Sequence, residues 1–390
     1  MGRNQRGGVP ASKLQAARVQ QGRSQDQMIR LLIARASLLN IPVASESSLK
    51  VMLSRWENGH DQVTDPGYRR LFREIYGRTN EELGFPPEVL NEGTEELRDR
   101  LMIARNIDAE TLDLFQNQVN VLRHSDKRFG AVAVLDQLNG LIKQMEDIRA
   151  FSVSSRHRKR LAAILTDART LAGWTALDRG SQLQGWKYHE DAKVSAREAD
   201  APHLLAHAAA QQAVILLDLG DPTGAVDLLE YARSAAESRV PALLKAWLAA
   251  AHGEGLATAG RRGEALQSFD QADTWLPVDP VDAEMPFLLL NTGHLARWRG
   301  SALTRLGEQE AIDQLEAAAR ELEPSPQSAI RGQTSMYVDL AFAYSAAGDR
   351  EAALLYAQQA RRLASQIGSD RQRQRLQTLT LPGASGATIA

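Results

Sequence analysis

The sequence predicts an all-α protein in which short N-terminal helices precede an α-solenoid, a stack of helical hairpins. Alanine and leucine are abundant, whereas valine, isoleucine and aromatic residues are sparse, and this composition favours helix over strand. Near the N-terminus, capping residues and glycines divide the chain into short amphipathic helices. Later in the chain, glycines recur at spacings of 40, 40, 47 and 41 residues, which is typical of stacked helical repeats.

Composition also bounds the function. The 390 residues include no cysteine, which excludes disulfides and fits the reducing cytoplasm, where we expect the protein. We expect no signal peptide and no membrane contact, because no apolar run approaches the roughly 18 residues of a membrane-spanning helix. The sequence carries no phosphate-binding loop, nucleophile elbow or dinucleotide fingerprint, so we expect neither an enzyme nor a cofactor.

Charge is distributed unevenly along the chain. Residues 1–87 hold 13 Lys and Arg against 8 Asp and Glu, a net charge of +5. Residues 88–390 hold 33 against 40, a net charge of −7. A basic N-terminal module on an acidic body suits binding of a phosphate backbone by the first part only, although chance asymmetry is the alternative.

Helix signals predict five short helices in the N-terminal module. Gly22 ends the first helix, and Ser24 is a good N-cap for the second, whose apolar face includes Met28 and Leu32. Pro66 stands at the start of the fourth helix. The predicted helices cover residues 12–21, a stretch from 25 onward, a helix from 47 that stops at a glycine, 66–76 and 80–83.

The third of these helices combines apolar residues with donors and positive charge. A helix with small polar residues first and basic residues along one face fits the DNA major groove. Its ending, Leu-Ser-Arg-Trp-Glu-Asn-Gly at residues 53–59, closely resembles the recognition helix of helix-turn-helix domains of the lambda-repressor/Cro (XRE) type. The resemblance implies binding of double-stranded DNA, with a phosphate contact from Gln25 at the start of the positioning helix. The candidate DNA contacts are Gln25, Ser47, Ser48, Lys50, Ser54 and Arg55.

Two observations leave open the alternative that this module is a small helical domain that has lost DNA binding. Residues 38–45 make the second helix and its turn longer than this family has, which leaves the angle between the two helices undetermined. Trp56 and Glu57 also fit the core and the cap of any small helical domain.

The repeats share two features. A turn glycine stands at each of Gly180, Gly220, Gly260, Gly307 and Gly348. Seven residues earlier stands a small residue, which lets two antiparallel helices pack closely: Gly173, Ala213, Gly253, Gly300 and Ala341. The spacing of Ala265, Phe269, Ala272 and Pro277 matches the second half of a tetratricopeptide (TPR) repeat. We predict five TPR-like repeats over residues 155–366 and a capping helix at 370–376.

First helices of such repeats line a concave groove, which we expect to bind a peptide or a partner protein. The candidate groove residues are Trp174, Trp247, Glu254, Asn291, His294, Arg297, Arg305 and Phe342. The alternative is that each is a solvated or packed residue without a ligand. His203 and His207 have a metal-ligand spacing, but the sequence offers no third ligand, so we expect no metal. His189, Glu190 and Asp191 are expected on the hydrophilic face of a repeat helix.

The whole chain resembles bacterial regulators that join a repressor-type helix-turn-helix to a TPR-like sensor. This resemblance implies a homodimer whose DNA binding responds to a second partner; the alternative is a TPR scaffold without DNA readout. Between the modules we expect helices at 95–106, 109–125 and 127–149, the last interrupted by Gly130 and Gly140. The predicted organisation is a flexible arm (1–10), the DNA-binding domain (11–87), a helical linker or atypical repeat (88–153), the repeats with their cap (154–378) and a disordered tail (379–390).

Overall fold

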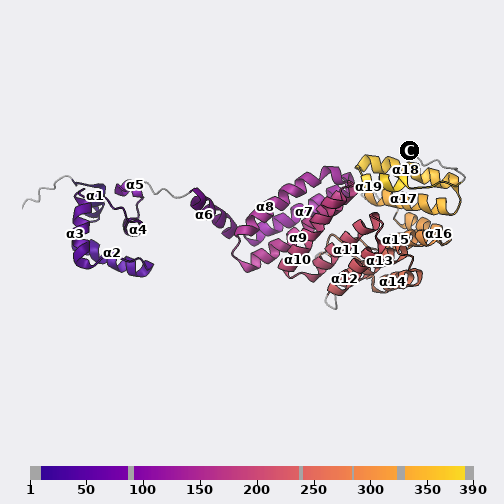
Figure 1. Cartoon of the computed structure of the whole chain (residues 1–390), viewed down its shortest axis with the longest axis horizontal. Helices are drawn as coiled ribbons and strands as arrows, with labels where there is room; N and C mark the ends of the chain where they lie inside the picture. Colours follow the sequence, from indigo (N-terminus) through magenta and orange to yellow (C-terminus); the bar gives the residue numbers. More distant parts are fainter. Residues whose placement is uncertain (1–9, 87–91, 237–239, 283–284, 323–329, 383–390) are drawn as a thin grey trace, which may run out of the picture. The chain divides into compact units, whose positions relative to one another are not determined.

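All regular structure that is described in the chain is helical (Figure 1). The structure is a computed structural model that describes residues 10–86, 92–236, 240–282, 285–322 and 330–382. The chain divides into two compact units, Met1–Leu97 and Arg98–Ala390. Within the described ranges, no helix has the length and apolar character needed to span a bilayer. The prediction of an all-α fold is confirmed.

Five helices build the first unit around a core of aliphatic and aromatic side chains. Ser24 caps α2, where its hydroxyl and the side chain of Gln27 form a reciprocal capping box. Trp56 packs against Tyr68 and Phe72, with ring centroids 5.2 and 5.8 Å apart. The helices are α1 (Lys13–Gln20), α2 (Gln25–Leu39), α3 (Glu46–Glu57), α4 (Pro66–Tyr76) and α5 (Asn80–Leu83).

The long connection between the second and third helices is divided between helix and coil. α2 continues to Leu39 and ends at Asn40, which adopts the left-handed conformation with φ 57°. The next residues are non-helical up to Ser45, whose hydroxyl accepts a hydrogen bond from the backbone N–H of Ser48. Because Ser45 caps α3, this helix begins at Glu46, one residue earlier than the sequence predicts.

The segment that joins the modules differs from the prediction. A helix beginning at residue 127 is wrong, because α7 (Ala109–Phe129) runs on to Gly130, where φ is 82°. A Cβ at Gly130 would lie 2.0 Å from the carbonyl oxygen of Ile367, so only glycine fits there. Gly140 does not interrupt its helix, and no neighbouring atom lies within 4 Å of a Cβ built on it. The other elements of this segment are α6 (Glu92–Arg105), η1 (Ala131–Ala133) and α8 (Leu135–Phe151).

Five helical hairpins follow, as the sequence predicts. All five turn glycines have positive φ, from 73° to 86°. The small residues mark close helix crossings: a Cβ on Gly253 would lie 2.8 Å from the Phe269 ring, and one on Gly300 2.8 Å from Leu315. The hairpins are α9 (Ser155–Asp178) with α10 (Gln182–Ala199), α11 (Pro202–Asp218) with α12 (Pro222–Ala236), α13 (Ala242–Thr258) with α14 (Arg262–Trp275), α15 (Thr292–Leu306) with α16 (Ala311–Glu321), and α17 (Ile330–Ala346) with α18 (Arg350–Ile367).

The chain beyond the hairpins is packed further than predicted. α19 (Asp370–Gln377) matches the expected capping helix. Leu379 and Leu381, assigned to a disordered tail, are only 1% and 5% exposed and join Leu376 in one apolar cluster. The tail prediction is therefore wrong for residues 379–382, because these leucines cover the apolar face of the last hairpin. Residues 383–390, like residues 1–9 of the predicted arm, lie outside the described ranges.

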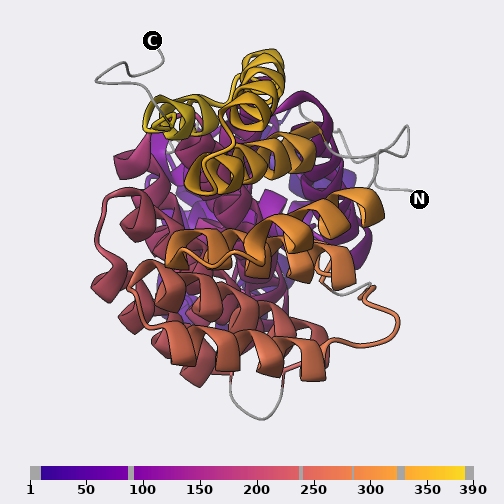
Figure 2. The ribbon, with the colours of Figure 1, turned by 90° about the vertical axis from the view of Figure 1, so that its right-hand side faces the viewer.

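The stack of hairpins closes on itself. Its last helices, α17 to α19, contact α7 and α9 at the other end of the unit (Figures 1 and 2). Arg331 of α17 forms ion pairs with Asp126 of α7 and Asp178 of α9, both at 2.6 Å. Ser369, directly before α19, donates its hydroxyl to Asp178 at 2.6 Å. We call these four residues the seam; it joins positions about two hundred residues apart.

Candidate functional site

One face of α3 carries the side chains that the sequence predicts as DNA contacts. Leu49, Leu53 and Trp56 hold the opposite face in the core. Five of the predicted contacts are exposed or half-buried on α3: Ser47, Ser48, Lys50, Ser54 and Arg55. The helix thus separates an anchoring face from a polar, basic face that is open to a partner.

A buried carboxylate fixes α3 in place. Glu57 is fully buried, and Arg18 of α1 donates to its two oxygens from Nε and Nη2, at 2.6 and 2.8 Å. The amide of Gln25, the predicted phosphate contact on α2, also donates to Glu57, at 2.8 Å. These three side chains tie α3 to both preceding helices. They set the interhelical geometry that the long connection left open in the sequence.

The two cations predicted to read DNA are in surface ion pairs. Lys50 Nζ lies 3.1 Å from Asp26 Oδ1, and Arg55 Nε lies 2.6 Å from Asp61 Oδ2. All four side chains are roughly half exposed, and ion pairs of this kind contribute about 0–1 kcal/mol. Phosphate oxygens can therefore replace the two carboxylates at little cost.

The second unit contains a cavity of about 1330 Å³ inside the closed stack. Most of its lining comes from first helices of the hairpins, and the rest from α7, α19, the loop before α15 and parts of the second helices α12, α16 and α18. Six of the eight predicted groove residues line it: Trp174, Trp247, Glu254, His294, Arg297 and Arg305. The other two do not: Asn291 caps α15, accepting from the backbone N–H of His294 at 2.8 Å, and Phe342 lies beneath the guanidinium of Arg375.

Aromatic rings form one side of the cavity. His207 packs on Trp247 and Phe287, with ring centroids 5.1 and 4.4 Å apart, and Trp298 meets Trp247 edge-on at 5.7 Å. Burial and the nearby Arg123 lower the pKa of His207 to about 3, so its ring is neutral at physiological pH. The structure therefore makes His207 part of an aromatic surface. Among the described residues no cluster suited to a metal ion is found.

Four guanidinium groups also line the cavity; we call Arg297, Arg305, Arg371 and Arg375 the arginine cluster. Arg297 and Arg375 share one carboxylate, that of Asp339, at 2.8 and 3.0 Å. Asp339 is 2% exposed. Although burial acts to raise it, the pKa of this carboxyl is lowered by Arg375 and Arg297, so the group stays ionised.

Several important residues of the cavity were not singled out from the sequence. Trp298, Asp339 and Arg371 line it, yet each stands at a position that the repeat pattern leaves undefined. Arg371 belongs to the helix predicted only as a cap. Its role depends on Asp218, to which its guanidinium donates, and on Trp174, whose ring centroid lies 5.6 Å from Arg371 Cζ. No local sequence signal connects these positions.

His189 contradicts its predicted place on a hydrophilic face. Its side chain is completely buried against Gly173, at the crossing of α9 and α10. Neither ring nitrogen has a hydrogen-bond partner among the described residues. Burial lowers the pKa of His189 to about 3, so it is a neutral packing residue.

Comparison of the chain with protein-family models and with curated proteins finds no match. Its function must therefore be inferred from the two sites described above.

Proposed function

We propose that the protein is a DNA-binding transcriptional regulator whose activity is controlled by a ligand in the cavity of the second unit. The observation that carries this proposal is the polar, basic face of α3, held by the buried Glu57 contacts and occupied by Ser47, Lys50 and Arg55. A rigid helix with exposed donors and cations at successive turns fits the major groove.

Electrostatics support this assignment. The net charge of +5 in residues 1–87 contrasts with −7 in the rest of the chain, so attraction to a phosphate backbone concentrates on the first unit. The cation–carboxylate pairs on α3 are weak enough to be exchanged for phosphate contacts.

The proposed DNA complex contains two copies of the chain. One recognition helix reads only a few base pairs, too few to define a genomic address. Two helices related by a twofold axis would read half-sites about 34 Å apart, or a multiple of that distance. We propose an inverted repeat as the target and a homodimer in the cytoplasm as the binding species.

The ligand proposed for the cavity is a peptide or a segment of a partner protein. The cavity is large, and it combines aromatic area with charged groups that fix direction. A ligand can change DNA affinity only by binding one shape of the stack better than another. The alternative function is a TPR-like scaffold without DNA readout, in which the same cavity holds another protein and the N-terminal module assists that docking.

Genomic footprinting of the tagged chain, followed by gel shifts on the recovered sites, tests the proposal. Lys50→Ala with Arg55→Ala should weaken specific binding at least about tenfold, because each good base contact is worth about 1–3 kcal/mol. Arg35→Ala with Arg70→Ala is the matched control: it removes two cations of the same unit outside α3, the half-buried Arg35 that pairs with Glu74 and the exposed Arg70, and should preserve most of the affinity.

Salt dependence separates the two functions. A DNA complex of the parent chain should weaken steeply as salt rises, since counterions are released from the phosphates. If the Lys50/Arg55 variant binds its genomic sites as well as the parent does, α3 is not the reading helix. If the parent recovers no common DNA sequence, the scaffold function is favoured instead.

A further inference from the structure

The cavity lining carries more positive than negative side chains. Among the residues that line it are eight Lys and Arg but five Asp and Glu. The cations are Arg123, Lys127, Arg297, Arg305, Arg320, Arg331, Arg371 and Arg375, and the anions are Asp126, Asp167, Glu254, Glu316 and Asp339. Two of these cations, Arg331 and Arg371, also pair with carboxylates outside the lining, Asp178 and Asp218, so the net excess is smaller than the lining alone gives. Buried or partly buried charges are screened weakly by salt, so the remaining excess acts on whatever enters the cavity.

Part of the remaining excess lies at Arg297 and Arg375, because the other two members of the arginine cluster have carboxylates of their own: Arg305 pairs with Glu254 and Arg371 with Asp218. Asp339 faces two guanidinium groups, so one positive charge of this pairing is uncompensated. Within the described residues Arg297 donates only through Nη1, and its remaining N–H groups stay available. Its side chain is 19% exposed and lines the cavity. These donors are prepared for an acceptor that the chain itself does not supply.

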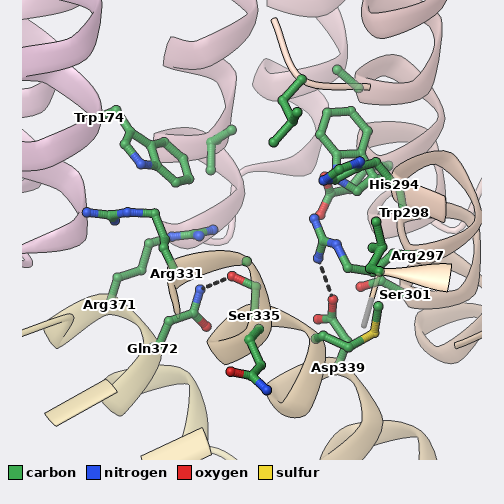
Figure 3. A pocket seen from close by; sticks show the side chains of 18 of the residues that line it. Trp174, His294, Arg297, Trp298, Ser301, Arg331, Ser335, Asp339, Arg371 and Gln372 are labelled. Atoms are coloured by element: carbon green, nitrogen blue, oxygen red, sulfur yellow. Dashed lines mark hydrogen bonds and ion pairs between the residues drawn. The ribbon is translucent and has the colours of Figure 1, made fainter. Parts of the chain in front are cut away.

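Aromatic surfaces stand beside the available donors. Figure 3 shows Arg371 with Trp174 on one side of the cavity and Arg297 with Trp298 on the other. The Trp174 ring lies under Arg371, and Trp298 continues the aromatic surface that includes Trp247. A flat apolar body between these walls would bury its faces against indole rings while a polar end reaches the guanidiniums.

We infer that the cavity binds a compound with one acidic group and an aromatic body, the acidic group being held by Arg297 and Arg371. A carboxylate fits, because guanidinium N–H groups donate to both of its oxygens, as Arg371 already does to Asp218. The free carboxylate of a short aromatic peptide and a small aromatic acid share this chemistry. The inference builds on the proposed function only in treating the cavity as the regulatory site.

Closure of the stack limits the size of this compound. The seam joins both ends of the second unit through Arg331, so the cavity is bounded where an open superhelix would leave a continuous groove. A compact acid fits a bounded cavity of this kind better than a long extended segment of a large partner does.

Two fluorescent probes with the same aromatic body test the inference on the full chain. 8-Anilinonaphthalene-1-sulfonate carries an anionic group, and N-phenyl-1-naphthylamine is its neutral counterpart. The parent should bind the sulfonate with one saturable site. Arg297→Gln and Arg371→Gln should each weaken this binding about tenfold or more, as expected for a hydrogen bond to a charged group, and change binding of the neutral probe less than about twofold.

Each variant has a matched control on its own helix. Arg299 is two residues from Arg297 and pairs with Asp270 away from the cavity lining, and Arg373 is two residues from Arg371 and pairs with Asp370. Arg299→Gln and Arg373→Gln should leave both probes bound as in the parent. Circular dichroism of each variant verifies folding, and the Arg297 variant keeps the test decisive if the Arg371 variant unfolds.

Competition then identifies the source of the acid. N-acetyl-Leu-Leu-Trp with a free carboxylate and indole-3-propionate are each added against the bound sulfonate, with their carboxamides as controls. Displacement by the acids alone supports the inference, and the tighter acid assigns the source. The inference is overturned if the parent shows no saturable sulfonate site, if the carboxamides compete equally, or if both glutamine variants bind like the parent. None of these readouts involves DNA, so they fail independently of the proposed function.

Discussion

Arg331 should be the residue on which closure of the stack depends most. It is 11% exposed and is the shared partner of Asp126 and Asp178, which are 4% and 2% exposed. Arg331→Met keeps most of the apolar stem and removes the charge, leaving two buried carboxylates without their cation. Breaking a buried ion pair in this way costs about 3–5 kcal/mol, so we expect the free energy of unfolding of the second unit to fall by that amount.

Urea unfolding followed by tryptophan fluorescence measures this loss. Five of the six tryptophans belong to the second unit, so the signal reports mainly on it. The exposed Arg362→Met is the control and should change the free energy of unfolding by less than about 0.5 kcal/mol. The triple variant Arg331→Met, Asp126→Asn, Asp178→Asn should recover most of the loss, because no uncompensated charge remains buried.

The stability that Arg331→Met loses should also depend on pH, in a direction that the pKa of Asp126 determines. Burial already raises the pKa of Asp126 in the folded chain, and loss of Arg331 removes a cation that opposes this rise. An acid whose pKa is higher in the folded than in the unfolded chain contributes stability below its unfolded value, about 3.9, and loses it as pH rises through the folded value. The deficit of the variant should therefore shrink on acidification from pH 7 towards pH 4. A deficit under about 1 kcal/mol at pH 7, or one that stays constant with pH, would refute the reasoning.

Two further predictions concern packing inside the second unit. His189→Phe should raise the free energy of unfolding at pH 7 by about 1–3 kcal/mol, because it removes two buried ring nitrogens that lack partners in the described residues. Burial lowers the pKa of the native histidine to about 3, so the parent loses stability as pH falls below about 6.5, where the histidine of the unfolded chain takes up a proton. The variant lacks this group, and its free energy of unfolding should therefore fall less on acidification, by up to about 1.4 kcal/mol per pH unit. An unchanged pH slope in urea titrations would contradict this. Gly130→Ala should lower the free energy of unfolding by several kcal/mol in the same assay, since the alanine Cβ would lie 2.0 Å from the carbonyl oxygen of Ile367. Gly140→Ala, where the Cβ meets no neighbouring atom, should raise it by about 0.5–1 kcal/mol. Equal effects of the two substitutions would show that the backbone of Ile367 does not lie this close to Gly130.

The sequence was informative wherever a local rule decides the structure. The helix bounds at Pro66–Tyr76 and Asn80–Leu83 follow from capping residues a few positions away. The five turn glycines and the small residues before them predict five hairpins, because each requirement concerns one turn or one helix crossing. Six predicted groove residues line one cavity for the same reason: the repeat period alone fixes which face of each first helix points inward.

Contacts between distant segments could not be predicted in this way. The Glu57 contacts with Arg18 and Gln25 depend on how three helices meet. In the sequence, a glutamate at the end of a helix reads the same whether it caps that helix or ties it to its neighbours. Leu379 and Leu381 follow the last helix in a stretch that reads as a tail, until the face of the last hairpin makes their burial favourable.

Closure of the stack is the clearest case. Asp126 and Arg331 are 205 residues apart, and their pairing results from the small rotation between successive hairpins summed over the whole stack. Each rotation depends on side-chain packing that no single repeat reveals. The sequence by itself therefore determined most of the helices, the five hairpins and six of the residues that line the cavity. Only the tertiary structure decided that the groove becomes a bounded cavity in which an arginine cluster lies beside aromatic rings, because burial and charge pairing there belong to segments that meet only in the folded chain.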